Sequence, residues 1–138
     1  MMDWDECLRR NFVKKNSFDV ELVKSLKKGS SKKTISNKKL VLDEDTAETK
    51  IGIVYDSLRE ILEALSIKKG FKIYNHECYV GFIDGILKMK ENSIEFDKFR
   101  KIRNGINYYG KVLSIDNAKV VIENILILRD KFLRILDE

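Results

Sequence analysis

Apolar residues recur three or four positions apart over most of this chain, which is the spacing of α-helices with one buried face. The clearest example follows Asp45 and Thr46, whose side chains favour the start of a helix. Its apolar face is formed by Ile51, Val54, Tyr55, Leu58, Ile61, Leu62 and Leu65. This helix is predicted to end at Lys69 and Gly70, because a basic residue and a glycine suit a helix C-terminus.

The preceding segment carries a second helical stripe, which begins near Asp19. Gly29, Ser30 and Ser31 interrupt the stripe, and they either end the helix or let a neighbouring helix approach closely. We favour one helix over residues 18–37. Residues 1–17 are charged and weakly patterned, and we expect them to form an N-terminal extension with a short helix that packs on the body.

Three more helices are predicted towards the C-terminus. The first is capped by Asn75 and is broken at residues 92–93, and the second stops near Gly110. The last begins at Ser114 or Asp116 and runs almost to the end of the chain. Its apolar stripe is widened by Val120, Leu126 and Ile127. That helix is therefore either central or shared with a partner.

Together these segments predict an all-α fold, an antiparallel helical bundle of four to five helices formed by residues 18–138. The chain of 138 residues contains no proline, so the commonest helix breaker is absent. We find no strand pattern, internal repeat or domain linker in the sequence. The length fits one domain with a hydrophobic core.

The distribution of apolar and charged residues also indicates the cellular compartment of the protein. No run of residues approaches the roughly 18 apolar positions that a membrane span needs. The N-terminus carries Asp3, Asp5 and Glu6, where a signal peptide has basic residues. We therefore expect a cytoplasmic protein.

The cysteines and the histidine give no sign of a metal site. Cys7 and Cys78 are far apart and match no metal-binding spacing, so we expect two reduced cysteines that pack in the core. His76 is the only histidine in the chain. Its neighbour Glu77 and Cys78 cannot converge with it on one ion from adjacent helical positions. We expect no metal and no other cofactor.

Positive charge is concentrated in one segment. Seven lysines and no acidic residue lie between residues 24 and 42, and removing these seven from the 27 basic residues leaves 20 against 22 acidic ones. One interpretation is a surface that binds phosphates, most naturally of RNA, with Lys32 and Lys33 as candidates. The other, which we favour, is a solvated lysine-rich face, because no arginine or aromatic residue lies among the lysines.

An unusual helical face lies within residues 100–110. Arg103 flanks the apolar side of the predicted helix, and Tyr108 points nearly opposite the core. The polar residues that come further round are Arg100, Asn104 and Asn107. A solvated face normally carries Lys, Glu or Gln, whereas Gly105 costs a helix about 1 kcal/mol relative to alanine. This composition indicates a face that contacts another molecule.

The same residues allow a second interpretation. The helix could fray at Gly105, with Asn107 in a turn and Tyr108 folded back into the core. The spacing alone supports both interpretations equally.

The pattern formed by Arg103, Asn104 and Tyr108 resembles the Arg-Asn-x-x-x-His signature of HEPN domains (higher eukaryotes and prokaryotes nucleotide-binding). The likeness extends over residues 18–136 as a helical pattern, and its specific part is about a dozen residues. HEPN domains are small helical bundles, often homodimeric, and are common in archaeal and bacterial toxin–antitoxin and defence systems. The resemblance implies a HEPN-like bundle that forms a homodimer.

In catalytic HEPN domains, the arginine, asparagine and histidine of two protomers meet in a cleft and cleave RNA without a metal ion. The resemblance implies that Arg103 binds or polarises a phosphate and that Asn104 orients it. Tyr108 stands in place of the histidine, and a tyrosine with a pKa near 10 is a poor general base at neutral pH. It still donates a hydrogen bond or stacks on a base. Arg100 and Asn107 are candidate contacts to a nucleotide or nucleic acid.

Some family members carry a tyrosine two residues after the histidine, which a partner nucleotidyltransferase modifies. Gly110 holds that position here, so this feature does not transfer directly. His76 is an alternative source of an imidazole, although a histidine in a first helical turn is more often a surface or interhelical residue.

Three functions remain after these considerations. The first is a HEPN-like module that binds a nucleotide, an RNA phosphate or a partner nucleotidyltransferase in a dimer cleft, with weak or absent nuclease activity. The second is a metal-independent ribonuclease toxin of a toxin–antitoxin system. The third is a helical protein–protein adaptor. Because Tyr108 replaces the histidine, we favour the first over the second, and the polar face of residues 100–110 disfavours the third.

Overall fold

The computed structural model describes residues 2–109 and 113–138, and the side chains of residues 106–109 lie outside that description. The described part forms six helices and two short strands. In chain order these are α1 (Trp4–Arg9), β1 (Val13–Lys15), α2 (Val20–Lys39), α3 (Ala47–Lys68), β2 (Phe71–Ile73), α4 (Cys78–Gly85), α5 (Lys90–Tyr109) and α6 (Ile115–Leu136). The prediction of an all-α bundle is confirmed at the level of fold class.

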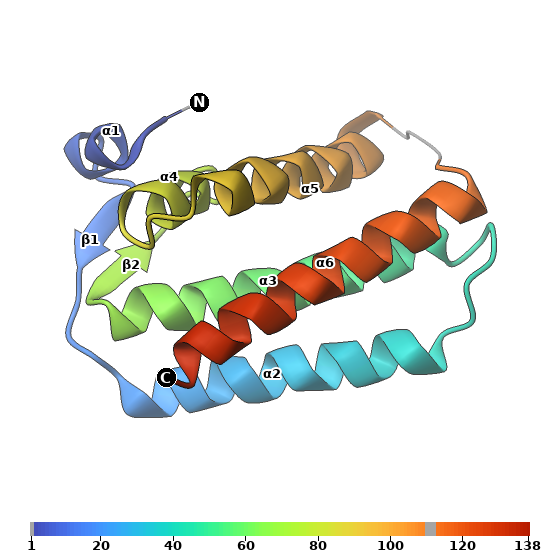
Figure 1. Cartoon of the computed structure of the whole chain (residues 1–138), viewed down its shortest axis with the longest axis horizontal. Coiled ribbons are helices and arrows are strands. Elements are labelled where there is room, and N and C mark those ends of the chain that lie inside the picture. Colours follow the sequence, from blue (N-terminus) through green and yellow to red (C-terminus); the bar gives the residue numbers. More distant parts are fainter. Residues whose placement is uncertain (1, 110–112) are drawn as a thin grey trace.

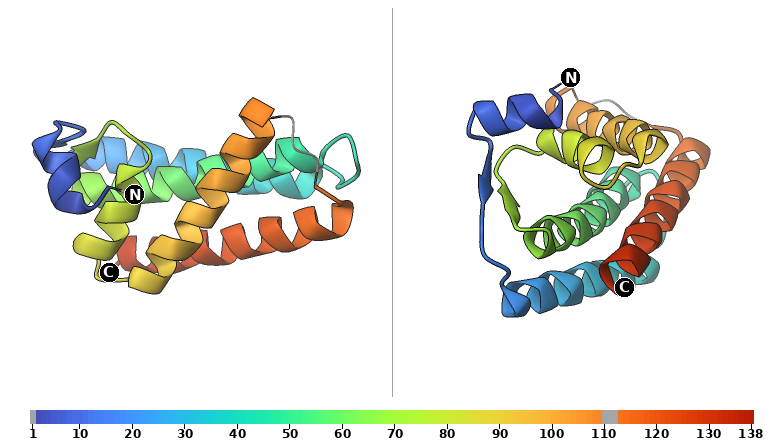
Figure 2. Two further views of the ribbon diagram at one scale, coloured as in Figure 1. Left: turned by 90° about the horizontal axis from the view of Figure 1, so that it is seen from above. Right: turned by 60° about the vertical axis from the view of Figure 1, so that its left-hand side comes forward.

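Helix α3 is the central element of the bundle. It packs against α2, α5, α6 and β2, and Figures 1 and 2 show it lying between α2 on one side and the α4–α5 pair on the other. Its apolar face is fully buried, as the sequence predicted, and includes Ile51, Tyr55, Leu58, Ile61, Leu62 and Leu65. Within the described residues, we find no helix that combines the length and the apolar character required to span a membrane.

Helices α2 and α6 begin at residues whose side chains cap the N-terminus, whereas Thr46 before α3 makes no such bond. The Asp19 carboxylate accepts a hydrogen bond from the Leu22 amide at 3.0 Å, and the Ser114 hydroxyl accepts one from the Asn117 amide at 3.1 Å. Gly70 ends the segment after α3 with φ +90°, a conformation that favours glycine. Helix α5 continues through Gly105 to Tyr109, so its backbone does not fray at that glycine.

Small residues allow α2 and α3 to approach closely. A methyl group at Gly29 would collide with the Glu60 carboxylate, and the buried hydroxyls of Ser30 and Ser57 lie 2.8 Å apart. The Ser57 hydroxyl also donates to the Ser30 carbonyl at 3.1 Å. From α6, the Arg129 Nε donates to the Ser30 hydroxyl at 2.8 Å. The chain therefore keeps one continuous helix through residues 29–31, as we favoured, and uses these residues for a polar contact among three helices.

The sequence prediction missed a small sheet. Strands β1 and β2 pair antiparallel, with Val13 opposite Ile73 and Lys15 opposite Phe71. The expectation that the chain has no strands is therefore wrong. Each strand is three residues long, which is too short for a period-two pattern to stand out.

The predicted helix break at residues 92–93 is also wrong. The chain turns earlier, between the end of α4 and Lys90, where Lys88 has φ 59°. Ser93 is buried inside α5, and its hydroxyl donates to the Lys90 carbonyl at 2.6 Å. This local bond satisfies the serine within the helix, so the residue that seemed to break the helix belongs to its first turn.

The two cysteines form a disulfide, contrary to the expectation of reduced thiols. Cys7 of α1 and Cys78 of α4 are joined, with their Cα atoms 6.0 Å apart, and both residues are fully buried. The α1 backbone crosses α4 at Gly81, where an added methyl group would lie 2.9 Å from the Trp4 nitrogen. The disulfide and this close approach hold the N-terminal segment against the bundle.

We predict that reducing the disulfide lowers the free energy of unfolding by about 4 kcal/mol, because the bond closes a loop of 71 residues in the unfolded chain. Chemical denaturation followed by circular dichroism, with and without a reducing agent, measures the difference. The Cys7→Ser/Cys78→Ser variant should match the reduced protein and should not respond to the reducing agent. Equal stability of the oxidised and reduced wild type would contradict the prediction.

Candidate functional site

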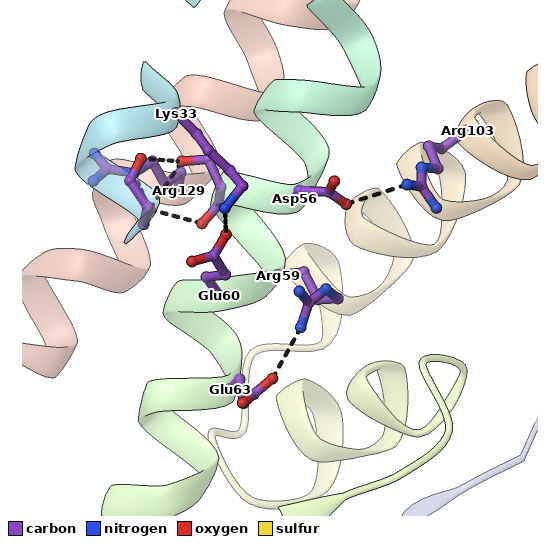
Figure 3. A network of polar contacts seen from close by, with 9 residues as sticks. Lys33, Asp56, Arg59, Glu60, Glu63, Arg103 and Arg129 are labelled. Carbon is purple, nitrogen blue, oxygen red and sulfur yellow. Dashed lines mark hydrogen bonds and ion pairs between the residues drawn. The ribbon is translucent and has the colours of Figure 1, made fainter. Parts of the chain in front are cut away.

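Arg103 lies where α5 faces the central helix. Its Nη2 donates to the Asp56 Oδ1 of α3 at 3.3 Å (Figure 3), and its guanidinium carbon lies 5.4 Å from the centre of the Tyr55 ring. The Arg103 and Asp56 side chains remain 28% and 33% exposed. Arg103 is thus held by one long ion pair and a cation–π contact while it still reaches solvent.

Two further arginines surround the same place, and we refer to Arg59, Arg100 and Arg103 as the arginine cluster. Arg100 donates from Nε and Nη2 to one oxygen of Asp97 at 3.0 and 2.9 Å. Arg59 donates from Nη1 to the Glu63 Oε1 at 2.9 Å. Positive charge from all three arginines acts on the Tyr55 hydroxyl. The cluster therefore surrounds one buried phenol, and its charge is balanced by the carboxylates of Asp56, Glu63 and Asp97.

Two buried donors in this cluster lack partners. Among the described residues, neither the Tyr55 hydroxyl nor the Arg103 Nε makes a hydrogen bond, and Tyr55 is only 1% exposed. Burial raises the pKa of Tyr55 to about 12, although the arginine charges oppose that shift. The phenol therefore keeps its proton at physiological pH and remains a donor. A buried donor without an acceptor costs about 1–3 kcal/mol, so a pair of them indicates a place for an acceptor.

His76 is electrostatically coupled to the arginine cluster. It precedes α4, and its ring lies 6.0 Å from the ring of Tyr79, a buried residue whose pKa is raised by burial. Partial burial lowers the pKa of His76, and the charges of Arg59 and Arg103 lower it further, against the opposing effect of Asp56 and Glu63. The histidine is therefore neutral at pH 7 and able to accept a proton.

The predicted site residues fall into two separate regions. Arg100, Arg103 and the half-buried Asn104 lie together on α5. Asn107 and Tyr108 continue the same helix, but their side chains lie outside the described part of the structure. Lys32 and Lys33 belong to α2, and Lys33 pairs with Glu60, one turn of α3 away from the Asp56 that pairs with Arg103 (Figure 3).

Sequence reasoning assigned Tyr55 to the core alone and did not select Asp56 or Arg59. Tyr55 belongs to the apolar stripe of α3, and its hydroxyl is polar only at the end of a buried ring. Asp56 and Arg59 are three residues apart and so share a helix face. A charged pair next to Tyr55 was the feature of the sequence that could have indicated this site. It does not indicate which helix packs over these residues.

The described residues contain no group of three or more histidine, cysteine, aspartate or glutamate side chains arranged to hold a metal ion. Comparison with protein-family models gave no match, and neither curated proteins nor solved structures showed a significant similarity to this chain.

The coupling of His76 to the cluster leads to a titration prediction. Because positive charge lowers the pKa of His76, Arg103→Ala should raise it, and Asp56→Asn should lower it further. An NMR pH titration of the imidazole measures both shifts directly, since the chain has one histidine. Arg134→Ala, which removes an exposed charge near the end of α6, is the matched control and should leave the pKa unchanged. A wild-type His76 that titrates at or above its ordinary value near 6.5 would contradict the assignment.

Proposed function

We propose that this protein is a HEPN-like module that binds a phosphate group of RNA or of a nucleotide at the arginine cluster, with weak or absent nuclease activity. The observation that carries the proposal is the pair of buried donors without partners, the Arg103 Nε and the Tyr55 hydroxyl. A phosphate offers acceptor oxygens in several directions and matches a guanidinium better than it matches an ammonium group.

Arg103 is the arginine best suited to take the ligand. Arg100 makes two short hydrogen bonds to Asp97, and Arg59 makes one at 2.9 Å to Glu63, whereas Arg103 has a single contact at 3.3 Å. A partly exposed ion pair of this kind contributes only about 0–1 kcal/mol. A phosphate can therefore replace Asp56 as the acceptor, and the phenol of Tyr55 supplies a neutral donor beneath it.

The proposal includes a homodimer and the interaction with a nucleotidyltransferase that the family resemblance implies. Val120 and Ile127 of α6 are 56% and 65% exposed, so the wide apolar stripe of this helix leaves side chains available to a second copy. Asn104 has the role of orienting the phosphate. The side chains of Asn107 and Tyr108 lie outside the described part of the structure, so their part in the site stays a prediction from the sequence. The tyrosine at the histidine position of the motif is the reason that we propose binding without efficient cleavage.

The binding function is tested by removing each partner of the central ion pair. Arg103→Ala should weaken binding of a fluorescent RNA oligonucleotide about tenfold or more, because a charge-assisted hydrogen bond is lost. Asp56→Asn should instead tighten binding a few-fold, because it frees the guanidinium from its internal acceptor. Fluorescence anisotropy measures both dissociation constants, and thermal unfolding verifies that the variants are folded.

Arg134→Ala is the control for loss of an exposed positive charge and should bind like the wild type. Opposite effects of Arg103→Ala and Asp56→Asn are expected only for a site that competes with the ion pair. If both substitutions leave binding unchanged, the ion pair is structural and the adaptor function gains support.

The second candidate, a metal-independent ribonuclease, is favoured by the coupling of His76 to Arg59 and Arg103. A neutral imidazole beside arginines can accept a proton from a ribose hydroxyl while an arginine stabilises the phosphate. This function predicts that the protein cuts RNA in the presence of EDTA and that His76→Gln and Arg103→Ala each abolish cleavage. Denaturing gel electrophoresis of a labelled RNA detects the products. Cleavage that persists in the His76→Gln variant would exclude the histidine from the reaction.

A further inference from the structure

The solvent side of α2 carries a line of lysines, which we call the lysine ridge and define as Lys24, Lys28, Lys32 and Lys39. All four side chains are exposed. The first three are four residues apart and so lie on one helix face at about 6 Å intervals. Ile35 lies on the same face and is 52% exposed. The ridge extends from Lys24 to Lys39, which is about 22 Å of helix.

Two of the three other lysines of α2 are paired within the fold, and the third, Lys38, is exposed. Lys27 pairs with Asp137 at 2.5 Å, and Lys33 pairs with the buried Glu60. The ridge differs, since among the described residues Lys28, Lys32 and Lys39 have no acidic partner within 4.0 Å. Lys24 reaches Glu21 at 3.7 Å only through two largely exposed side chains. The folded protein thus balances the inward lysines and leaves the outward row uncompensated.

The shape and composition of this surface favour a rigid polyanion as its ligand. Figures 1 and 2 show α2 as a straight helix along the outer edge of the bundle, where none of the described helices and strands covers its outward side. Residues 20–39 contain no aromatic residue and no arginine. Aromatic side chains are the platforms on which single-stranded bases stack, and arginines read base edges. Ammonium groups alone contact phosphates, which suits a duplex backbone without sequence preference.

We propose that the lysine ridge of α2 binds the phosphate backbone of a double-stranded nucleic acid through four ammonium–phosphate contacts, independently of sequence. This surface is separate from the arginine cluster, because α2 and α5 lie on different sides of α3 and the ridge lies on the outward side of α2. An anionic membrane would also attract lysines, but Ile35 is the one apolar residue among the ridge lysines, which is too little to insert into a bilayer.

The test compares two variants of equal charge. The ridge variant replaces Lys24, Lys28, Lys32 and Lys39 by glutamine, and the control variant replaces Lys15, Lys90, Lys98 and Lys119, which are exposed lysines on other elements. Both lower the formal net charge from +5 to +1. Binding of a fluorescent 20-base-pair duplex is measured by anisotropy between 50 and 200 mM salt (about the range in which phosphate contacts dominate).

For four phosphate contacts, the logarithm of the wild-type affinity should fall against the logarithm of salt with a slope of about −3.6, or roughly two orders of magnitude over this range. The ridge variant should lose most of that slope and at least about tenfold in affinity at low salt, whereas the control variant should retain the slope. Equal losses in the two variants would overturn the proposal, because they would show a response to net charge alone.

Two further measurements distinguish the alternatives. The ridge variant should retain the binding of a mononucleotide that Arg103→Ala weakens, so the proposal for the ridge and the proposal for the arginine cluster can each fail without the other. Sedimentation with vesicles of phosphatidylserine and phosphatidylcholine tests whether the ridge binds an anionic membrane instead. Binding to vesicles that depends on the ridge, without binding to the duplex, would overturn the proposal in favour of a lipid surface.

Discussion

The enclosure of α3 by the rest of the bundle is the constraint on which this structure depends. A helix that packs against neighbours on several sides must pair its polar groups inside the protein, because water does not reach them. On the side of α2 and α6, the chain meets this requirement with Ser57, whose hydroxyl contacts Ser30, and with Arg129, which donates to the same serine. Figure 3 shows this network beside the Lys33–Glu60 pair. This polar contact fixes how α2, α3 and α6 align. Apolar packing alone would specify the alignment less well.

On the α5 side of the same helix, the pairing is incomplete. Each arginine of the cluster has a carboxylate partner, but the Tyr55 hydroxyl and the Arg103 Nε have no acceptor among the described residues. Two buried acceptors on the α2 side, Asn37 Oδ1 and Glu60 Oε1, also lack a hydrogen bond among the described residues, although Glu60 is in an ion pair with Lys33. The α5 side differs because its two unpaired atoms are donors, and this is the physical basis for proposing an anionic ligand there.

The parts of the fold that could be predicted from sequence are those that depend on local spacing. Helix α3 and the start of α6 at Ser114 follow from apolar periodicity and capping residues. The disulfide could not be predicted, because Cys7 and Cys78 become neighbours only when α1 crosses α4 at Gly81. The same crossing brings β1 beside β2. The expectation of a cytoplasmic protein no longer has the support that reduced cysteines would give, and it stays a prediction.

The part of the candidate site that lies on α5 could be predicted from the sequence. The residues of α5 share a contiguous segment, so Arg103 and Arg100 were identified from the chain alone. Tyr55, Asp56 and Arg59 come from α3, and their relation to α5 depends on how the two helices pack. The lysines of α2 are a second case in which the sequence does not predict what the packing determines. Their number was evident from sequence, but only the fold separates the inward lysines, which have acidic partners, from the outward row. Composition therefore predicts how much charge a segment carries, whereas tertiary structure determines how much of it remains available to another molecule.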